Sequence, residues 1–195
     1  QYYVYVNCRF IDSAATSILN ELNGHAELLQ FDVTNQEEVE LAKRKFTQKK
    51  LDLLVNNAGI SVDGLLSALD LLEFNKVIQT NFFGAVRVFE CFEEKLLLAE
   101  DAVVINIGSI ASVRPKKGQG AYAASKAMLI KWSSQMAKQY FYAGVRFYTV
   151  SPGPVNTRML NQSDWYQKQN QQKSSLTKTP NPDIEKAKRQ QALSV

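Results

Sequence analysis

The chain has 195 residues, 45% of them hydrophobic and 22% charged, which is enough to bury the core of one ordinary domain and excludes a disordered tail or a mini-scaffold. No apolar run approaches the ~18 residues that cross a bilayer, and residues 1–10 lack the basic start of a signal peptide, so we predict a cytoplasmic protein with no membrane span. The formal charge of +4 comes mostly from residues 161–195, with six basic and three acidic side chains, so no nucleic-acid partner is predicted.

Five short, β-rich apolar runs recur along the chain, each followed by a stretch long enough for a helix. They lie at residues 2–6, 27–31, 51–55, 102–107 and 145–150. This alternation is typical of a parallel sheet covered on both faces, the α/β class. From about residue 161 the sequence becomes polar, and it predicts loop with at most one short helix over 182–192. We therefore expect a core over 1–160 and a lid or tail over 161–195.

Helix signals fill the stretches between these runs. Asp12 precedes a run that stops at Asn23-Gly24, Thr34 with Glu37 forms a capping-box pattern, and Asp70 with Glu73 forms another. A further helix is predicted over about 119–142, where the residues near one stripe are Ala121, Ala124, Met128, Trp132 and Met136. These signals are local, so they hold whatever the function.

The residues that follow each predicted strand are small, polar or turn-forming. They are 7–9, 32–33, 56–59, 108–109 and 151–153. In an open parallel sheet, ligands bind outside the carboxyl ends of the strands, so these clusters are candidates for a binding site. Turns favour the same residue types, and each cluster taken alone is equally explained as a turn.

A tyrosine and a lysine four residues apart carry the clearest chemical signal. Tyr122 and Lys126 share one face of a helix, and an ammonium beside a phenol stabilises the phenolate, which makes a usable acid or base near neutral pH. The alternative is an ordinary surface pair. Ser109, which follows a strand thirteen residues earlier, could bring its hydroxyl to the same point and favours the chemical interpretation.

Together with four further motifs, these residues closely resemble the pattern of the short-chain dehydrogenase/reductase family. The motifs have the order and spacing of that family from residue 1 to about 160. They are Asn56-Asn57-Ala58-Gly59, Asn81, Gly108-Ser109 and Pro152-Gly153-x-x-x-Thr157. The resemblance implies a Rossmann-like doubly wound parallel sheet. It also implies a catalytic tetrad in which Tyr122 donates the proton to a carbonyl, Lys126 assists it and holds the nicotinamide ribose, Ser109 binds the substrate oxygen, and Asn81 holds a water.

The same resemblance implies the cofactor contacts. Asp32 and Val33 match the adenine contact, Asn57 the ribose contact, and Val155 with Thr157 the nicotinamide side. A basic residue at the position of Arg9 typically meets the 2′-phosphate of NADP, and the acidic residue that would bind the ribose diol of NAD is absent at Cys8. NADP is therefore expected, although an arginine at a strand end is also a common solvated residue.

One part of the family pattern is missing, because no glycine-rich turn of the form TGxxxGxG occurs anywhere in the chain. The resemblance implies that the first βα unit and the last strand are missing, and we expect a fragment or an incomplete sequence. The missing first strand would lie between the strands at 2–6 and 51–55. These two strands should then not be hydrogen-bonded to each other.

The substrate is constrained only loosely. The stretch 59–66 and the run 118–126 look most like 3-oxoacyl-acyl carrier protein reductases of lipid metabolism. Broad carbonyl reductases and hydroxysteroid dehydrogenases share these segments. Ala143 stands where the carrier-protein reductases often have a basic residue. Arg114, Lys116 and Lys117 could supply a substitute basic rim, although a run of charges on a loop is usually only solvated. Specificity would lie in 158–174. The prediction is an NADP-dependent reductase of a ketone or acyl thioester; the alternative is an inactive fragment that acts only as an interaction partner.

Two further expectations concern assembly and metals. The helices around 70–94 and 119–142 carry more apolar residues than one sheet face can cover, so we expect a homodimer or homotetramer. Cys8 and Cys91 lack CxxC spacing and His25 has no partner in sequence, so neither a disulfide nor a metal site is predicted.

Overall fold

The computed structural model describes residues 2–64, 70–155, 157–163 and 166–167. Contacts divide the chain into two compact units, Gln1–Gly153 and Pro154–Val195. In the described part of the chain, no helix combines the length and the apolar character needed to cross a membrane.

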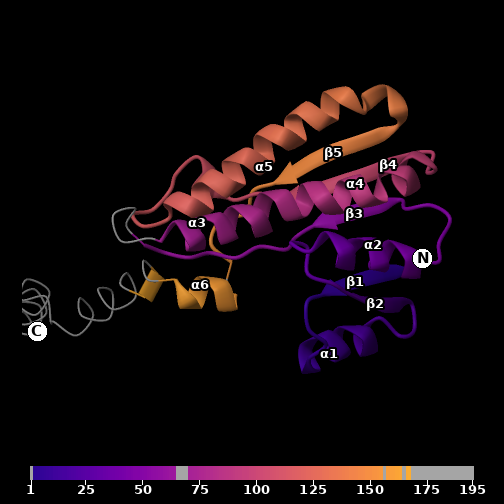
Figure 1. Cartoon of the computed structure of the whole chain (residues 1–195), viewed down its shortest axis with the longest axis horizontal. Helices are drawn as coiled ribbons and strands as arrows, with labels where there is room; N and C mark the ends of the chain where they lie inside the picture. Colours follow the sequence, from indigo (N-terminus) through magenta and orange to yellow (C-terminus); the bar gives the residue numbers. More distant parts are fainter. Residues whose placement is uncertain (1, 65–69, 156, 164–165, 168–195) are drawn as a thin grey trace, which may run out of the picture. The chain divides into compact units, whose positions relative to one another are not determined.

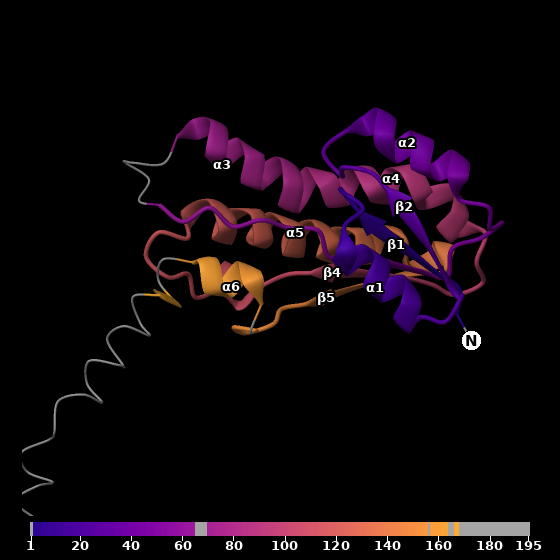
Figure 2. The same cartoon turned by 90° about the horizontal axis from the view of Figure 1, so that it is seen from below.

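The first unit contains five parallel strands, arranged in two sheets (Figures 1 and 2). The strands are β1 (Val4–Cys8), β2 (Ala26–Gln30), β3 (Leu53–Asn56), β4 (Ala102–Ile107) and β5 (Val145–Val150). One sheet has the order β1-β2 and the other β3-β4-β5. The predicted parallel α/β class is thus confirmed, and so is the prediction that β1 and β3 are not hydrogen-bonded to each other.

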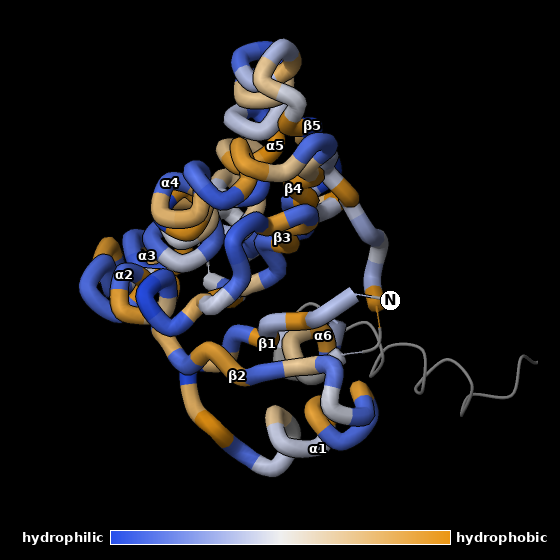
Figure 3. Tube along the Cα trace, turned by 90° about the vertical axis from the view of Figure 1, so that its right-hand side faces the viewer, coloured by the Kyte–Doolittle hydropathy of each residue, from blue (hydrophilic) through white to orange (hydrophobic). Residues whose placement is uncertain are grey.

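Helices follow the strands in the expected alternation. They are α1 (Ser13–Glu21), α2 (Gln36–Lys45), α3 (Leu71–Ile78), α4 (Gly84–Leu97) and α5 (Gly120–Gln139), with short turns η1 (Gln79–Phe83), η2 (Ile110–Ser112) and η3 (Phe141–Ala143). The η1 segment is π-helical and joins α3 directly to α4. Figure 3 shows α2 and α4 on one side of the strands and α1 on the other.

Two of the three predicted caps are confirmed. Asp12 accepts a hydrogen bond from the backbone N–H of Ala15 (2.9 Å), and Asp70 accepts one from Leu72 (3.1 Å). The predicted cap at Thr34 is wrong, because Asn35 accepts from the first N–H groups of α2. Thr34 instead donates hydrogen bonds from its backbone N–H and its hydroxyl to the carboxylate of Asp32, which follows β2.

The buried face of α5 differs from the predicted apolar stripe. Its buried residues are Ala121, Ser125, Lys126, Leu129 and Ser133, whereas Met128 is 38% exposed. Ser125 and Lys126 can be buried because each finds a hydrogen-bond partner inside the fold. The predicted stripe and the buried face overlap in part, because Ala121 is buried and Trp132 and Met136 pack against the core around β4 and β5.

Two hydrophobic clusters hold the layers together. The first packs β2 against α2 and α4 and contains Leu29, Phe31, Val39, Phe46, Val88 and Phe92, among others. The second packs β4 and β5 against α4 and contains Phe89, Leu96, Val104, Val145 and Phe147, among others. Because α4 contributes to both clusters, it connects the two sheets.

The second unit contains the short helix α6 (Arg158–Gln162), which the sequence did not predict. The side chain of Thr157 caps it by accepting from the backbone N–H of Leu160 (3.3 Å). The helix expected over 182–192 lies outside the described residues.

Candidate active site

Tyr122 and Lys126 lie on the inner side of α5, which packs against β4 and β5. The side chain of Lys126 is 3% exposed, and its Nζ donates a hydrogen bond to the backbone oxygen of Ile107 at 2.6 Å, just where β4 ends. The Nζ atom lies 5.9 Å from the centroid of the Tyr122 ring. Burial lowers the pKa of Lys126 to about 8. The pair therefore places a cation beside the phenol in a site largely shielded from water.

Asn81 lies in the π-helical segment η1 and is 1% exposed. Its side-chain oxygen accepts from the backbone N–H of Ile60 (2.7 Å), and its amide donates to the oxygen of Ile60 (2.9 Å) and to Oγ of Ser125 (2.9 Å). Both amide hydrogens are in use, so the side chain ties the loop after β3 to η1 and α5. A water held by this side chain would have to donate to the amide oxygen.

Ser125 is a residue of this cluster that the sequence did not single out. It is fully buried, accepts from Asn81, and donates to the backbone oxygen of Tyr122 at 2.7 Å. The hydroxyl therefore joins η1 to the turn of α5 that carries the tyrosine. Its spacing of four residues from Ala121 was the available signal, because it places a small polar residue on the inner face.

Gly59 brings the loop after β3 to the same point. A Cβ atom built on it would lie 3.4 Å from Oδ1 of Asn81 and 3.5 Å from Nζ of Lys126. A side chain there would occupy the space beside the ammonium. The backbone of the loop after β3 therefore passes close to both Asn81 and the ammonium of Lys126.

Ser109 follows β4 and caps η2, which packs against α5. Its Oγ accepts from the backbone N–H of Ala111 (3.1 Å), so the hydroxyl hydrogen remains available to donate. The fold therefore brings the elements carrying Asn81, Ser109, Tyr122 and Lys126 together around one helix.

Arg9 and Asp32 meet at the carboxyl ends of β1 and β2. Their charged groups lie 3.9 Å apart, and the Arg9 guanidinium lies 4.8 Å from the centroid of the Phe10 ring. Burial acts to raise the pKa of Asp32, but the hydrogen bonds from Thr34 and the charges of Arg9 and Arg87 outweigh it and lower that pKa. Two of the predicted cofactor residues are therefore neighbours, and Asp32 is held as a carboxylate.

Within the described part of the chain, the other predicted cofactor residues form no hydrogen bond or ion pair with the side chains of Arg9 or Asp32. Asn57 is exposed just after β3. Val33 is buried against Gly84, where an added Cβ would come within 2.7 Å of its side chain. Val155 and Thr157 belong to the second unit.

The loop between η2 and α5 is basic and is fixed by a backbone hydrogen bond at Gly118. Arg114, Lys116 and Lys117 are exposed, and the loop continues to Gly118, whose oxygen accepts from the backbone N–H of Gly64 at 2.9 Å. Gly118 has a φ of +89°, a conformation that favours glycine. The bridge fixes the loop that leads into α5.

Comparison with known proteins agrees with this arrangement. The family model for short chain dehydrogenases matches residues 2–168. The chain belongs to the short-chain dehydrogenase family. This is a family of oxidoreductases that use a nicotinamide cofactor, so the resemblance described from the sequence motifs is confirmed.

Curated relatives of this short-chain dehydrogenase include several reductases. The chain is 31% identical over 150 residues to the 3-oxoacyl-[acyl-carrier-protein] reductase FabG of Vibrio cholerae, covering 76% of this chain and 62% of the relative. It is 34% identical over 136 residues to the NADPH-dependent 1-acyldihydroxyacetone phosphate reductase of Schizosaccharomyces pombe, covering 68% and 46%. The chain thus spans less than two thirds of the length of these relatives.

A solved structure supports the fold. The gluconate 5-dehydrogenase of Burkholderia cenocepacia, in complex with NADP and tartrate, superposes with a TM-score of 0.75 at 24% identity, covering 84% of this chain and 67% of that one. The Rossmann-like arrangement predicted for this short-chain dehydrogenase is therefore confirmed.

Proposed function

We propose that the protein is an NADP-dependent reductase that converts a ketone or a 3-oxoacyl thioester to the alcohol. The observation that carries this proposal is the buried Lys126 ammonium beside the ring of Tyr122. The similarity to a 3-oxoacyl-[acyl-carrier-protein] reductase and to an NADPH-dependent reductase supports the substrate class and the cofactor. A small-molecule or acyl-thioester substrate would enter at this edge of the sheet.

The chain's own residues account for the proton in this reaction. When bound, NADPH supplies the hydride to the carbonyl carbon. The Tyr122 hydroxyl gives its proton to the carbonyl oxygen, while the Ser109 hydroxyl donates a hydrogen bond to the same oxygen. The Lys126 ammonium stabilises the phenolate that remains. Asn81 and Ser125 hold the loop after β3 and the first turns of α5 in register, so the acid and the cation keep their spacing.

The family resemblance assigns residues of this chain to the two ends of a dinucleotide. By the family resemblance, Lys126 and Tyr122 would hold the nicotinamide ribose, and Val155 and Thr157 would contact the nicotinamide. Asp32, Val33 and Asn57 would hold the adenosine end, and Arg9 would pair with the 2′-phosphate. The 195 residues contain no TGxxxGxG turn, so they supply no backbone cradle of that kind for the pyrophosphate.

Replacing the tyrosine hydroxyl tests the proposal directly. Tyr122→Phe should lower kcat for reduction of a 3-oxoacyl thioester or ketone by ~10² or more, because it removes the proton donor, and should leave the Kd for NADPH nearly unchanged. Tyr142→Phe is the matched control, since that ring is 96% exposed, and it should keep full activity. A Tyr122→Phe enzyme that retains more than about a tenth of the activity rejects Tyr122 as the acid.

A second candidate function follows from the missing glycine-rich turn. Without a phosphate cradle, the 195-residue chain would keep the tetrad but serve only as an interaction partner. Isothermal titration with NADPH, together with the intact mass of the purified protein, separates the two. A chain of 22.0 kDa that binds no NADPH at millimolar concentration favours the interaction role.

A homodimer or homotetramer is part of the proposal. Phe83 on η1, Leu97 on α4 and Met128 on α5 are apolar side chains that remain exposed on the helices expected to pair. Light scattering at micromolar concentration should give a multiple of the chain mass, and a monomer would count against it.

A further inference from the structure

The turn between β2 and α2 leaves one backbone donor without a partner. The N–H of Asp32 donates to Oε2 of Glu38 at 2.7 Å, and that of Thr34 donates to the carboxylate of Asp32 at 2.8 Å. The N–H of Asn35 donates to the backbone oxygen of Asp32 at 3.0 Å. Among the described residues, no acceptor meets the N–H of Val33. A donor therefore remains open immediately after Asp32.

The carboxylate of Asp32 offers an acceptor beside this donor. Its Oδ1 accepts from the backbone N–H and the hydroxyl of Thr34. Its Oδ2 lies 3.9 Å from Nη1 of Arg9, which is longer than a hydrogen bond, so this oxygen can still accept one. Oδ2 and the N–H of Val33 stand on consecutive residues. They match a ligand edge with a donor next to an acceptor, such as the exocyclic amine and N1 of adenine.

Arg87 reaches this turn from α4. Its Nη1 donates a hydrogen bond to the backbone oxygen of Val33 at 2.7 Å. The side chain of Val33 lies against Gly84, about one turn earlier on the same helix, where an added Cβ would come within 2.7 Å of it. The helix therefore holds Val33 both by its carbonyl and by its side chain. The direction of the open N–H follows from these two contacts.

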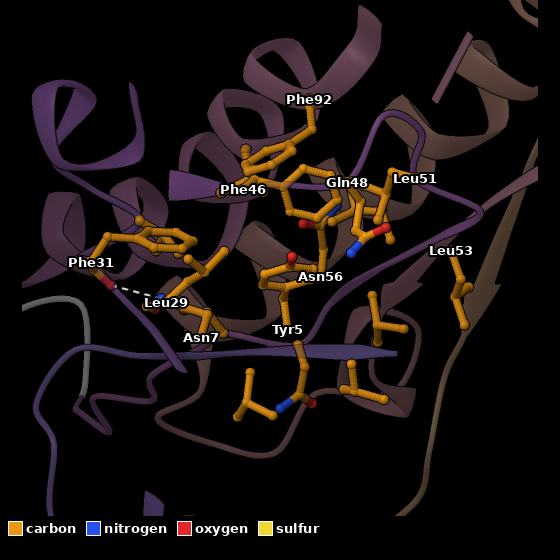
Figure 4. Close-up of a pocket in the computed structure, with 18 of the residues that line it drawn as sticks. Tyr5, Asn7, Leu29, Phe31, Phe46, Gln48, Leu51, Leu53, Asn56 and Phe92 are labelled. Atoms are coloured by element: carbon orange, nitrogen blue, oxygen red, sulfur yellow. Dashed lines mark hydrogen bonds between the residues drawn. The ribbon is translucent and has the colours of Figure 1, made fainter. Parts of the chain in front are cut away.

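The strand that leads into the turn is fixed separately, from β1. The side-chain amide of Asn7 donates to the backbone oxygens of Leu29 (3.2 Å) and Phe31 (2.9 Å), and Figure 4 shows these residues side by side. The position of the chain before Asp32 thus depends on Asn7. The position of the peptide group that follows Val33 depends on Arg87.

Two arginines act on this turn, and their surroundings differ. The side chain of Arg9 is 61% exposed and faces the Asp32 carboxylate, whereas Arg87 is half-buried and bonded to backbone. Burial acts to raise the pKa of Asp32, but the hydrogen bonds from Thr34 and the charges of Arg9 and Arg87 lower it. Arg87 therefore favours the ionised acceptor and fixes the donor beside it, while Arg9 remains accessible to a ligand phosphate.

We propose that Arg87 is a positioning residue for the base of the dinucleotide. By holding the carbonyl of Val33, it keeps the Val33 N–H and the Asp32 carboxylate at the spacing that fits N1 and the exocyclic amine of adenine. The inference rests on the proposed binding of NADP at Asp32 and Val33, and it adds the residue that sets the choice of base. Arg87 acts through Val33 and has no direct contact with the ligand.

The hypoxanthine analogue of NADPH, deamino-NADPH, tests this role. In the analogue an oxygen replaces the exocyclic amine and N1 carries a hydrogen, so the donor and the acceptor are exchanged. Titration followed by nicotinamide fluorescence gives the Kd of each dinucleotide and needs no turnover. The unmodified chain should bind NADPH at least about tenfold more tightly than the analogue, because two hydrogen bonds depend on the base.

Three variants locate the effect. Arg87→Met should reduce the preference for NADPH over the analogue to about threefold or less, since the Val33 N–H is no longer held. Its preference for NADPH over NADH, which Arg9 is expected to set, should stay that of the unmodified chain. Arg44→Met, the same change at an exposed position on α2, is the matched control and should keep the full preference for adenine.

Arg87→Lys keeps the charge and a donor on a different side chain. Its preference for NADPH over the analogue should lie below that of the unmodified chain and above that of Arg87→Met. This variant decides the question if Arg87→Met does not fold, which circular dichroism establishes. A preference in Arg87→Lys equal to that of the unmodified chain, with Arg87→Met unfolded, would overturn the proposal.

Other results would overturn it as well. These are equal binding of NADPH and its analogue by the unmodified chain, an equal loss of preference in Arg44→Met, or a weaker but unchanged preference ratio in Arg87→Met, which would mark a merely structural role. A chain that reduces its substrate without any preference for adenine refutes this inference alone. A chain whose preference depends on Arg87 but that reduces no ketone or thioester refutes the proposed reductase and supports this inference.

Discussion

Asn81, Ser125 and Lys126 are buried, and their hydrogen bonds join η1, α5, the loop after β3 and the end of β4. In contrast, the Arg9 side chain is exposed, and the edges of β1 and β3 that face each other pair with no described strand. The first region is assembled by the chain itself, with α5, η1 and the loop after β3 in fixed register. The second region presents unpaired backbone groups on β1 and β3 and the exposed charge of Arg9. The difference indicates that the cluster around Lys126 is held by the chain's own hydrogen bonds, while Arg9 and these strand edges are held by fewer contacts within the described residues.

The largest effect is expected at the centre of the assembled region. Asn81→Ala removes three hydrogen bonds and leaves the N–H and C=O of Ile60 without their partner, which should lower the free energy of unfolding by ~3 kcal/mol. Asn75→Ala, on the exposed side of α3, is the control and should be nearly neutral. Urea unfolding monitored by circular dichroism measures both. Equal stabilities would mean that the cluster does not hold this region together.

Two glycines distinguish a tight position from an open one. Gly84→Ala would place a Cβ 2.7 Å from the side chain of Val33, and the required shift should cost about 1–3 kcal/mol. Gly120→Ala, at the start of α5, meets nothing within 4 Å and should be neutral or stabilising by about 0.5–1 kcal/mol. Thermal unfolding of both variants gives the comparison. A stable Gly84→Ala protein would show that α4 and the β2 end are not closely packed.

The buried ammonium predicts a specific dependence of stability on pH. The pKa of Lys126 is about 8 in the folded chain against 10.5 ordinarily, so between these values the unfolded chain binds a proton that the folded chain does not. The free energy of unfolding should therefore rise with pH above 8, by up to ~1.4 kcal/mol per pH unit, and show no such term below 8. The Lys126→Met variant lacks this titrating group. The difference between the unfolding free energies of the unmodified chain and the variant therefore removes the contributions of all other titrating groups. A difference that stays flat from pH 8 to 10 contradicts the burial.

At Arg9, in the exposed region, the expected effect is on the preference for NADPH over NADH. Arg9→Asp should shift the ratio of kcat/KM for NADPH to that for NADH by about tenfold toward NADH, because a guanidinium pairs with a phosphate far better than with a neutral diol. Arg44→Asp, an exposed position on α2, makes the same charge change away from the site and should leave the ratio unchanged. Identical ratios in both variants would make Arg9 an ordinary surface charge.

The sequence predicted those features that depend on local pattern. Strand runs, the caps at Asp12 and Asp70, and the helix carrying Tyr122 and Lys126 follow from periodicity and spacing. It failed where a tertiary partner decides. Thr34 does not cap α2 because Asp32 takes its donors, and Ser125 and Lys126 lie on the buried face of α5 because Asn81 and Ile107 provide partners that lie far away in the sequence. The role of Ser125 followed only from the contact with Asn81.

Amide hydrogen exchange of the free chain tests the contrast between the two regions most directly. The N–H of Ile60 is bonded to Asn81 inside the assembled cluster, whereas the N–H of Leu53 lies on the edge of β3 that pairs with no described strand. The account predicts that Ile60 exchanges at least ~10² times more slowly than Leu53, relative to their unstructured rates. Exchange of Ile60 as fast as that of Leu53 would contradict it, because the cluster around Lys126 would then not be formed in the absence of ligand.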